Sequence, residues 1–162
     1  MKITLSFLFL STYAVMAQTN DYINPRAVGY SDAVVVHGGK TIYISGQVPV
    51  TAMGQIVGKG DLAAQTVQVF ENIRKVLAKA GATFDHVVKM NAYIVNCKPE
   101  DVAIVRDVRH QYLSQKTPPA STMVGVTSLV DPDFLIEIEV PFLEQGGISM
   151  ATREPSGSRA SR

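Results

Sequence analysis

The segment FLIEIEV, residues 134–140, constrains the possible folds of this chain more than any other stretch. From Ile136 onwards apolar and acidic residues alternate, which is the pattern of a β-strand whose two faces meet different surroundings. One face carries Phe134, Ile136, Ile138 and Val140. The other face, extended by one residue, carries Leu135, Glu137, Glu139 and Pro141. Two carboxylates on one strand face cannot enter the core of a monomer unpaired, so this second face is predicted to be solvated or to contact another subunit.

Other periodic segments place this strand in a domain that mixes helices and strands. Runs rich in β-branched and aromatic residues predict strands over residues 33–36, 41–45, 86–96, 121–129 and 134–142. Apolar residues at helical spacing predict helices over residues 61–80 and 99–115. Asp61 is a suitable N-cap and Gly81 a suitable stop for the first helix, and Pro99 suits the first turn of the second.

The predicted order is β-β-α-β-α-β-β, which indicates an α+β fold with both helices on one face of a mixed sheet. A chorismate-mutase-like fold requires this order. The chain has 162 residues, enough for one domain with a hydrophobic core and too few for two. We predict one domain over residues 18–145, followed by a tail over residues 146–162 whose low apolar content favours disorder.

The first 17 residues have the pattern of a secretory signal peptide. Lys2 supplies a positive charge, residues 3–15 form an apolar run, and Val15 and Ala17 are the small residues before a cut after Ala17. The run is too short to span a bilayer comfortably, and no cysteine follows the cut to carry a lipid anchor. The chain is therefore predicted to be periplasmic or secreted, without a membrane anchor after cleavage. A buried N-terminal element is the alternative interpretation.

Charge, cysteine and histidine content argue against several classes of function. The formal net charge is +1 and no cluster of Lys and Arg precedes the tail, which argues against nucleic acid as a partner. Cys97 is the single cysteine, and we interpret it as a small buried hydrophobe, although a helix start close by could activate it. His37, His86 and His110 lie in separate elements without a second ligand at metal-binding spacing, so neither a metal site nor a cofactor is predicted.

Six motifs occur in a recognisable order: VGYSDAV, TIYISGQVPV, the glycine-rich start of the first helix, VVKMNAYIVN, PPAS and LIEIEV. Together they resemble the RidA/YjgF family of reactive-intermediate deaminases over roughly residues 24–142. The resemblance implies a homotrimer whose sheets pack around the axis, with small-molecule pockets between neighbouring subunits. It also implies hydrolysis of 2-imino acids to 2-oxo acids and ammonia.

The resemblance assigns pocket positions as well. Tyr30 matches the pocket tyrosine, and Ser45 and Gly46 match the pair beside the ligand. Glu137 matches the carboxylate that activates the attacking water, which makes it the predicted catalytic residue. The alternatives are a loop aromatic that packs on the sheet for Tyr30, and a solvated or interface carboxylate for Glu137.

One position departs from the family pattern. Active deaminases read P-A-R where this chain reads Pro119-Ala120-Ser121, so a hydroxyl replaces the arginine that grips the substrate carboxylate. Such a loss removes on the order of 2–5 kcal/mol of carboxylate binding. Ser121 and Met123, which stands where cysteine is common, are assigned to the substrate pocket. Arg106 aligns with a pocket asparagine, and it belongs either to a solvated helix face or to the pocket, where it would restore a cation.

Three classes of function remain. The first is a RidA-type hydrolase of an imine, an enamine or a similar small carbonyl derivative, with a substrate altered because Ser121 replaces the arginine. The second is a trimeric small-molecule binding protein without turnover. The third is the endoribonuclease activity once ascribed to relatives, which the near-neutral charge disfavours. Export and the missing arginine together favour a ligand less acidic than a 2-imino acid.

Overall fold

The computed structural model describes residues 20–144. The predicted signal peptide and the predicted tail both lie outside the described residues. The strands are β1 (Asp21–Arg26), β2 (Tyr30–Val35), β3 (Lys40–Gln47), β4 (Lys89–Val95), β5 (Ala120–Val126) and β6 (Ile136–Glu144). The helices are α1 (Leu62–Lys79) and α2 (Pro99–Arg109), with a short 3-10 turn at Phe84–His86. Within the described part of the chain, no helix is long and apolar enough to cross a membrane.

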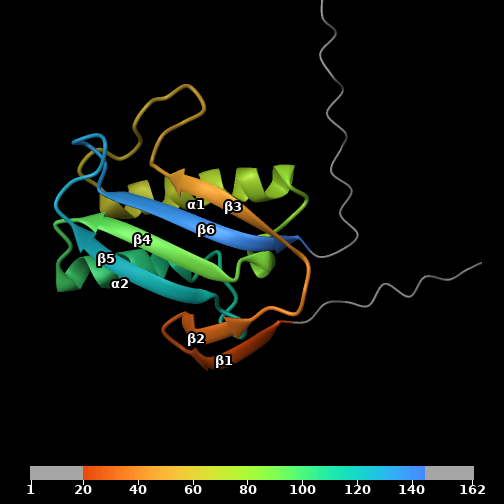
Figure 1. The fold of residues 1–162 in the computed structure, drawn as a ribbon. Coiled ribbons are helices and arrows are strands. Elements are labelled where there is room, and N and C mark those ends of the chain that lie inside the picture. Colours follow the sequence, from red (N-terminus) through yellow and green to blue (C-terminus); the bar gives the residue numbers. More distant parts are fainter. Residues whose placement is uncertain (1–19, 145–162) are drawn as a thin grey trace, which may run out of the picture.

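The strands form one mixed sheet in the order β1-β2-β5-β4-β6-β3 (Figure 1). The pairs β2–β5 and β4–β5 are parallel and the other pairs are antiparallel. Figure 1 shows both helices on the same side of the sheet, as the sequence predicted. Among residues 20–144, the opposite side carries no helix, and we call it the open face. The predicted α+β class is therefore confirmed.

The hydrophobic core fills the space between the sheet and the two helices. Its fully buried members include Ile136, Ile138, Val140 and Phe142 of β6, and Val69, Phe70, Ile73 and Leu77 of α1. The apolar face of β6 predicted from its alternation thus lies under the helices. Because successive side chains of a strand point to opposite faces, Glu137 and Glu139 lie on the open face.

An additional strand, β1, precedes the predicted ones. It is mostly exposed and pairs with β2 alone, at the edge of the sheet. Its sequence contains Pro25 and an Asn24 with φ of 47°, and neither feature is typical of a strand. An edge strand tolerates both, because one row of its N–H groups has no partner strand to bond. Local sequence preference therefore gave no signal for β1.

Helix α2 ends at Arg109, six residues before the predicted end. Beyond it the chain continues in tight turns, in which the N–H of Gln111 bonds to the carbonyl of Val108. Tyr112 fits the helical spacing of apolar residues, yet it leaves the helix and stacks on Phe70 of α1, with ring centroids 4.8 Å apart. The periodicity therefore correctly predicted that Tyr112 contacts the core, but it overestimated the length of the helix.

A buried glutamine fixes the start of β6. Gln65 of α1 is fully buried, and its side-chain N–H group donates to the carbonyl of Asp133 at 2.7 Å. Its side-chain oxygen accepts the backbone N–H of Leu135 at 2.8 Å. These two bonds hold the residues that lead into β6, the strand that carries Glu137. The amide therefore positions the predicted catalytic strand from the helix side.

We expect Gln65→Ala to lower the free energy of unfolding by about 2 kcal/mol or more, because it leaves a buried donor and a buried acceptor unpaired. Urea unfolding followed by circular dichroism measures this. The matched control is Gln111→Ala, at an exposed position, for which a change within about 0.5 kcal/mol is expected. Equal effects of the two substitutions would contradict the positioning role of Gln65.

Candidate functional site

The predicted catalytic Glu137 lies on the open face above an irregularity in the neighbouring strand. The pairing of β3 with β6 shifts register between Ile44 and Gln47, which is a β-bulge, and Ser45 and Gly46 lie within it. A Cβ atom built on Gly46 would overlap the carboxylate of Glu137. The absence of a side chain at Gly46 therefore leaves the space that the Glu137 carboxylate occupies, and a larger residue would make that carboxylate move. The structure thus brings together three predicted site residues: Ser45, Gly46 and Glu137.

Glu139, the second carboxylate of the strand, is held by two neighbours from β4. It accepts hydrogen bonds from the Asn91 amide at 2.8 Å and from the Tyr93 hydroxyl at 2.9 Å. These bonds, with the Asn91 bond the stronger cause, lower the pKa of Glu139 against the opposing effect of burial. The same carboxylate raises the pKa of Tyr93, because the phenol proton is held by a hydrogen bond to it. Glu137, in contrast, makes no hydrogen bond or ion pair within residues 20–144.

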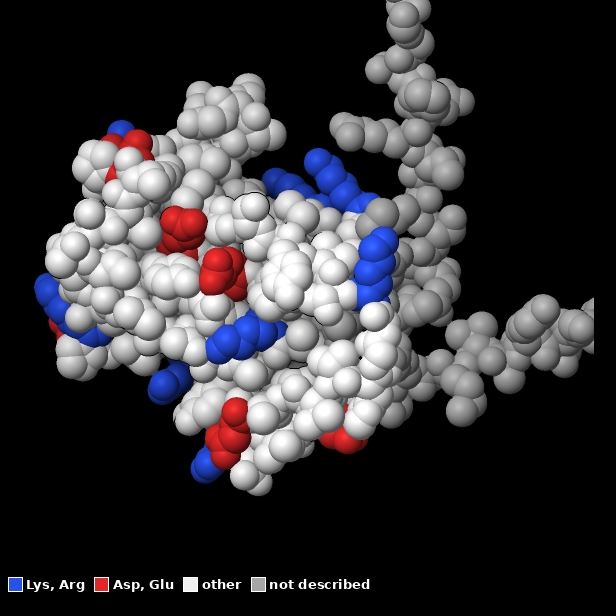
Figure 2. Space-filling model, in the orientation of Figure 1, with Lys and Arg blue, Asp and Glu red and all other residues white. Residues whose placement is uncertain are grey.

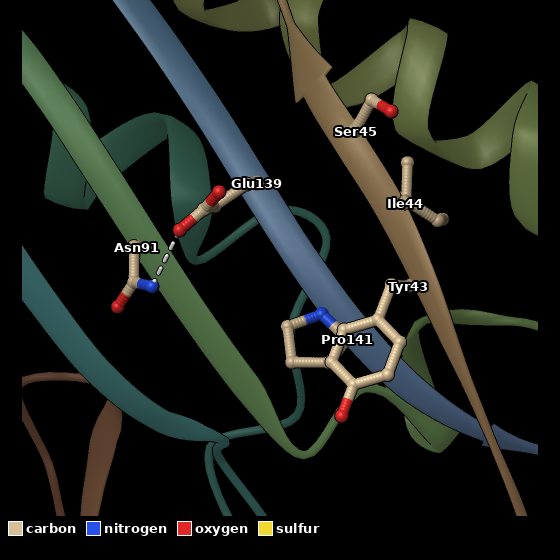
Figure 3. A pocket seen from close by; sticks show the side chains of 6 residues that line it. All are labelled: Tyr43, Ile44, Ser45, Asn91, Glu139 and Pro141. Carbon is tan, nitrogen blue, oxygen red and sulfur yellow. Dashed lines mark hydrogen bonds between the residues drawn. The ribbon is translucent and has the colours of Figure 1, made fainter.

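A shallow depression of about 320 Å³ adjoins this network. It is lined by Tyr43, Ile44, Ser45, Asn91, Glu139 and Pro141 (Figure 3). Figure 3 shows Asn91 directed at Glu139 across the surface of β4 and β6. Acidic side chains gather near the middle of the open face, and Lys or Arg side chains lie beside them and towards the edges of this face (Figure 2). The open face therefore offers carboxylates and hydrogen-bonding groups with cationic side chains close by.

A second group of predicted site residues lies on the helix-covered side of the sheet. Ser121 pairs in register with the buried Met90 of β4, and its hydroxyl accepts a hydrogen bond from Arg109 of α2 at 3.3 Å. Met123 points to the same side and packs against the hydrophobic core. Arg109 is thus the cation beside residue 121, the position at which this chain departs from the family pattern. Arg109 was not assigned to the site from the sequence.

The remaining two predicted residues lie close to this second group. Arg106 lies one turn before Arg109 on α2, and its Nε atom is buried without a hydrogen-bond partner. Tyr30 begins β2 directly after Gly29, and a Cβ atom on Gly29 would lie 3.1 Å from the Arg109 guanidinium. Arg109 also donates to the carbonyl of Val28 at 2.6 Å. The turn before β2 therefore closes over the end of α2.

The two groups of residues lie on opposite faces of one sheet and are separated by strand β4. Glu137 projects from the open face, whereas Ser121 projects under the helices. A single small molecule cannot touch both within one chain, because a layer of backbone and core side chains lies between them. In the described residues, the predicted site residues therefore fall into two groups, one on each face of the sheet.

The surroundings of Cys97 do not favour the thiolate. Burial raises the pKa of the Cys97 thiol, and Asp101 and Glu100 raise it further, so the thiol is not activated by the start of α2. Its Sγ atom faces the carbonyl of Lys98 at 3.7 Å. Between residues 20 and 144, no three His, Cys, Asp or Glu side chains are grouped closely enough to hold a metal ion.

Comparison with known proteins identifies the family. The family model described as Endoribonuclease L-PSP matches residues 22–141. A RutC family protein of Saccharolobus solfataricus is 41% identical over 118 residues, which are 72% of this chain and 88% of that protein. The 2-iminobutanoate/2-iminopropanoate deaminase of Dermatophagoides farinae is 34% identical over 106 residues, 65% of this chain and 79% of that protein. The crystal structure of YyfB from Yersinia pestis, a Rid family protein of unknown function, is 36% identical with a TM-score of 0.70, over 77% of this chain and 98% of that one. The chain therefore belongs to the RidA/YjgF family.

Three residues that lie in the two groups were not predicted from the sequence: Asn91, Tyr93 and Arg109. Asn91 and Tyr93 alternate with buried residues along β4, and that alternation could have placed them on the open face. Arg109 follows the buried Val105 by four residues, so helical periodicity puts it on the buried face of α2. Both patterns are visible in the sequence. Only the arrangement of strands and helices in the structure shows which residues they bring together.

We expect Tyr93→Phe to raise the pKa of Glu139 towards the ordinary glutamate value of about 4.3, because one of two hydrogen bonds to the carboxylate is lost. The native pKa of Glu139 is lowered, so the network stabilises the fold above the ordinary pKa and loses this effect as pH falls through the native value. The destabilisation by Tyr93→Phe is therefore largest near neutral pH and shrinks in acid.

Titration of the carboxylate resonances by NMR, together with urea unfolding between about pH 3 and pH 7, measures both effects. The control is Tyr43→Phe, on the same face and 79% exposed, for which no change in the Glu139 pKa is expected. An unchanged Glu139 pKa in Tyr93→Phe would show that the tyrosine does not hold this carboxylate.

Proposed function

We propose that this protein is a RidA-type hydrolase that converts an imine or an enamine to a carbonyl compound and ammonia. The observation that carries the proposal is the contrast between two carboxylates of one strand. Glu139 is occupied by Asn91 and Tyr93, whereas Glu137 has no partner within residues 20–144. Carboxylates in different surroundings can take different roles. Glu137 is therefore available to bind and orient water above the Gly46 bulge.

The proposed chemistry needs one general base. Water adds to the carbon of the C=N bond as Glu137 removes a proton from it, and the nitrogen is protonated. The resulting carbinolamine collapses to a carbonyl group, and the C–N bond breaks to release ammonia. An enamine first takes a proton on carbon to give the imine. The deaminase of Dermatophagoides farinae, whose name states 2-iminobutanoate and 2-iminopropanoate as substrates, supports this reaction class for the family.

The substrate proposed for this chain differs from a plain 2-imino acid in how it is held. The family arginine is Ser121 here, and a hydroxyl cannot supply the two parallel charged hydrogen bonds of a guanidinium. The pocket therefore retains Glu137, the carboxylate proposed to activate water. It lacks the arginine that would bind the carboxylate of a 2-imino acid. We propose an imine or enamine whose recognition does not use a cation at residue 121.

We further propose that the complete pocket forms between subunits of a homotrimer. The supporting observation is that the half with Glu137 and the half with Ser121 lie on opposite faces of the sheet. The open face also exposes apolar side chains, with Tyr43 79% and Val124 43% exposed. Export of the trimer from the cytoplasm remains part of the proposal, based on residues 1–17.

We expect Glu137→Gln to lower turnover by about 10²- to 10⁴-fold, the usual contribution of a general base. The assay measures ammonia from freshly generated 2-iminopropanoate and from an imine without a carboxylate, using the chain from Gln18. Glu139→Gln is the matched variant and should retain most turnover, because that carboxylate is engaged by its neighbours. Undiminished turnover in Glu137→Gln would contradict the assignment of Glu137 as general base. A wild-type protein that binds either compound without turning it over would favour a binding protein.

The assembly is tested separately by sedimentation equilibrium, where a mass three times that of the mature chain is expected. Val124→Glu on the open face should weaken the trimer, because burying an unpaired carboxylate in an interface is unfavourable. Val130→Glu, in a loop position that is 89% exposed, is the control and should leave the mass unchanged. A monodisperse wild-type monomer would remove the interface pocket from the proposal.

A further inference from the structure

The carboxylate of Glu139 is held by its neighbours at one oxygen only. The Nδ2 atom of Asn91 and the hydroxyl of Tyr93 both donate to its Oε1 atom, at 2.8 Å and 2.9 Å. Among residues 20–144, no donor bonds to its Oε2 atom. Figure 3 shows this second oxygen turned away from Asn91. The carboxylate is therefore fixed in orientation while one of its two acceptor oxygens is unused.

The negative charge of Glu139 is not neutralised within the described residues. Its two hydrogen bonds, with the Asn91 bond the stronger cause, lower the pKa of Glu139, so the group is ionised at neutral pH. Both donors are uncharged. Lys89, on the same face of β4, donates to the hydroxyl of Thr122 on β5 at 2.6 Å, on the side of β4 away from β6. Glu139 is thus a fixed anion that has an oxygen available for a cation.

Glu139 is also the one charged side chain among the six described residues that line the depression of about 320 Å³. Tyr43, another lining residue, pairs in register with Pro141 and is 79% exposed. Because the face of an aromatic ring is negative, an anion beside an exposed ring attracts an organic cation. A volume near 300 Å³ is at the lower end for small-molecule sites. The depression therefore suits a small ammonium group.

We propose that the depression binds a protonated amino group of the substrate, with Glu139 as its counter-ion and Tyr43 as its aromatic wall. This rests on the proposed function, because it names a second group by which the imine or enamine is held. Ser45 connects the two sites, since it lines the depression and lies in the bulge beside Glu137. Side chains two residues apart on a strand lie about 6–7 Å apart, so the ammonium group should lie about that far from the C=N carbon. The substrate class is then an imine or enamine that carries a second amino group.

A cationic substrate also fits the replacement of the family arginine by Ser121. An arginine at residue 121 would serve a carboxylate, which a substrate recognised by its ammonium group does not need. Glu137 and Glu139, on the open face of β6, attract a cation and repel a carboxylate. The serine and the available carboxylate oxygen therefore favour the same sign of ligand charge.

The binding probe is butylammonium, a small primary ammonium ion that cannot be hydrolysed. 1-Butanol is its uncharged match and butyrate its anionic match. Binding to the chain from Gln18 is followed by NMR titration, with the backbone amide of Asn91 as the local reporter. The variants are Glu139→Gln, which removes the charge and keeps the shape, and Tyr43→Leu, which removes the ring. Asp107→Asn, at an exposed carboxylate of α2, is the control.

We expect wild type and Asp107→Asn to bind butylammonium in preference to 1-butanol and butyrate. The affinity for butylammonium should fall about tenfold or more in Glu139→Gln, because a charged hydrogen-bond partner is lost. It should fall about two- to fivefold in Tyr43→Leu, the usual effect of an exposed cation–π contact. Glu139→Gln should fold, because the glutamine oxygen can still accept the bonds from Asn91 and Tyr93. Tyr43→Leu, at an exposed position, supplies the test if Glu139→Gln does not fold.

Turnover gives a second readout. The substrates are 4-(aminomethyl)benzaldimine, freshly generated by oxidation of 1,4-bis(aminomethyl)benzene, and 4-methylbenzaldimine as its uncharged match. The rigid ring keeps the ammonium group away from the C=N carbon and prevents cyclisation. We expect wild type to have the higher kcat/KM for the cationic imine, and Glu139→Gln to lower this preference about tenfold through KM and not kcat.

Equal butylammonium affinity in wild type, Glu139→Gln and Tyr43→Leu would overturn the inference. So would a loss confined to Glu137→Gln, since the cation would then pair with the other carboxylate of β6. Preferential binding of butylammonium by a wild type that hydrolyses none of the imines would leave the cation site standing and remove the hydrolase. Hydrolysis without butylammonium binding and without preference for the cationic imine would do the reverse.

Discussion

The burial of one face of β6 beneath α1 determines where the chemically active groups of this protein can lie. Ile136, Ile138 and Val140 are completely buried in the core. A slip of one residue in the pairing of this strand would move them into solvent and drive Glu137 and Glu139 under the helices. Because an unpaired buried carboxylate is strongly unfavourable, that slip is excluded. The bonds from the Gln65 amide to the residues before β6 hold the strand in this register. The open face with its two carboxylates is thus a consequence of the core.

Much of this could be predicted from the sequence, and the failures have physical causes. The alternation in FLIEIEV and the caps of α1 were sufficient for the sheet faces and the first helix, because each depends on neighbours in the chain. Strand β1 was missed because an edge strand need not have strand-forming residues. The predicted end of α2 was wrong because Tyr112 packs against the core from a turn and not from a helix. Where tertiary contacts replace local preference, a single sequence carries little signal.

The site shows the same division between local and tertiary information. Ser45, Gly46 and Glu137 lie together because β3 and β6 are antiparallel neighbours, which the family motifs imply. Arg109 was not assigned because the matched position on α2 was Arg106, and three residues along a helix change which side chain reaches the sheet. A parallel crossover brings β5 beside α2, so the residue that faces Ser121 depends on the packing of the helix and not on its sequence alone. The loss of an arginine at one position and the presence of another behind it become visible only in three dimensions.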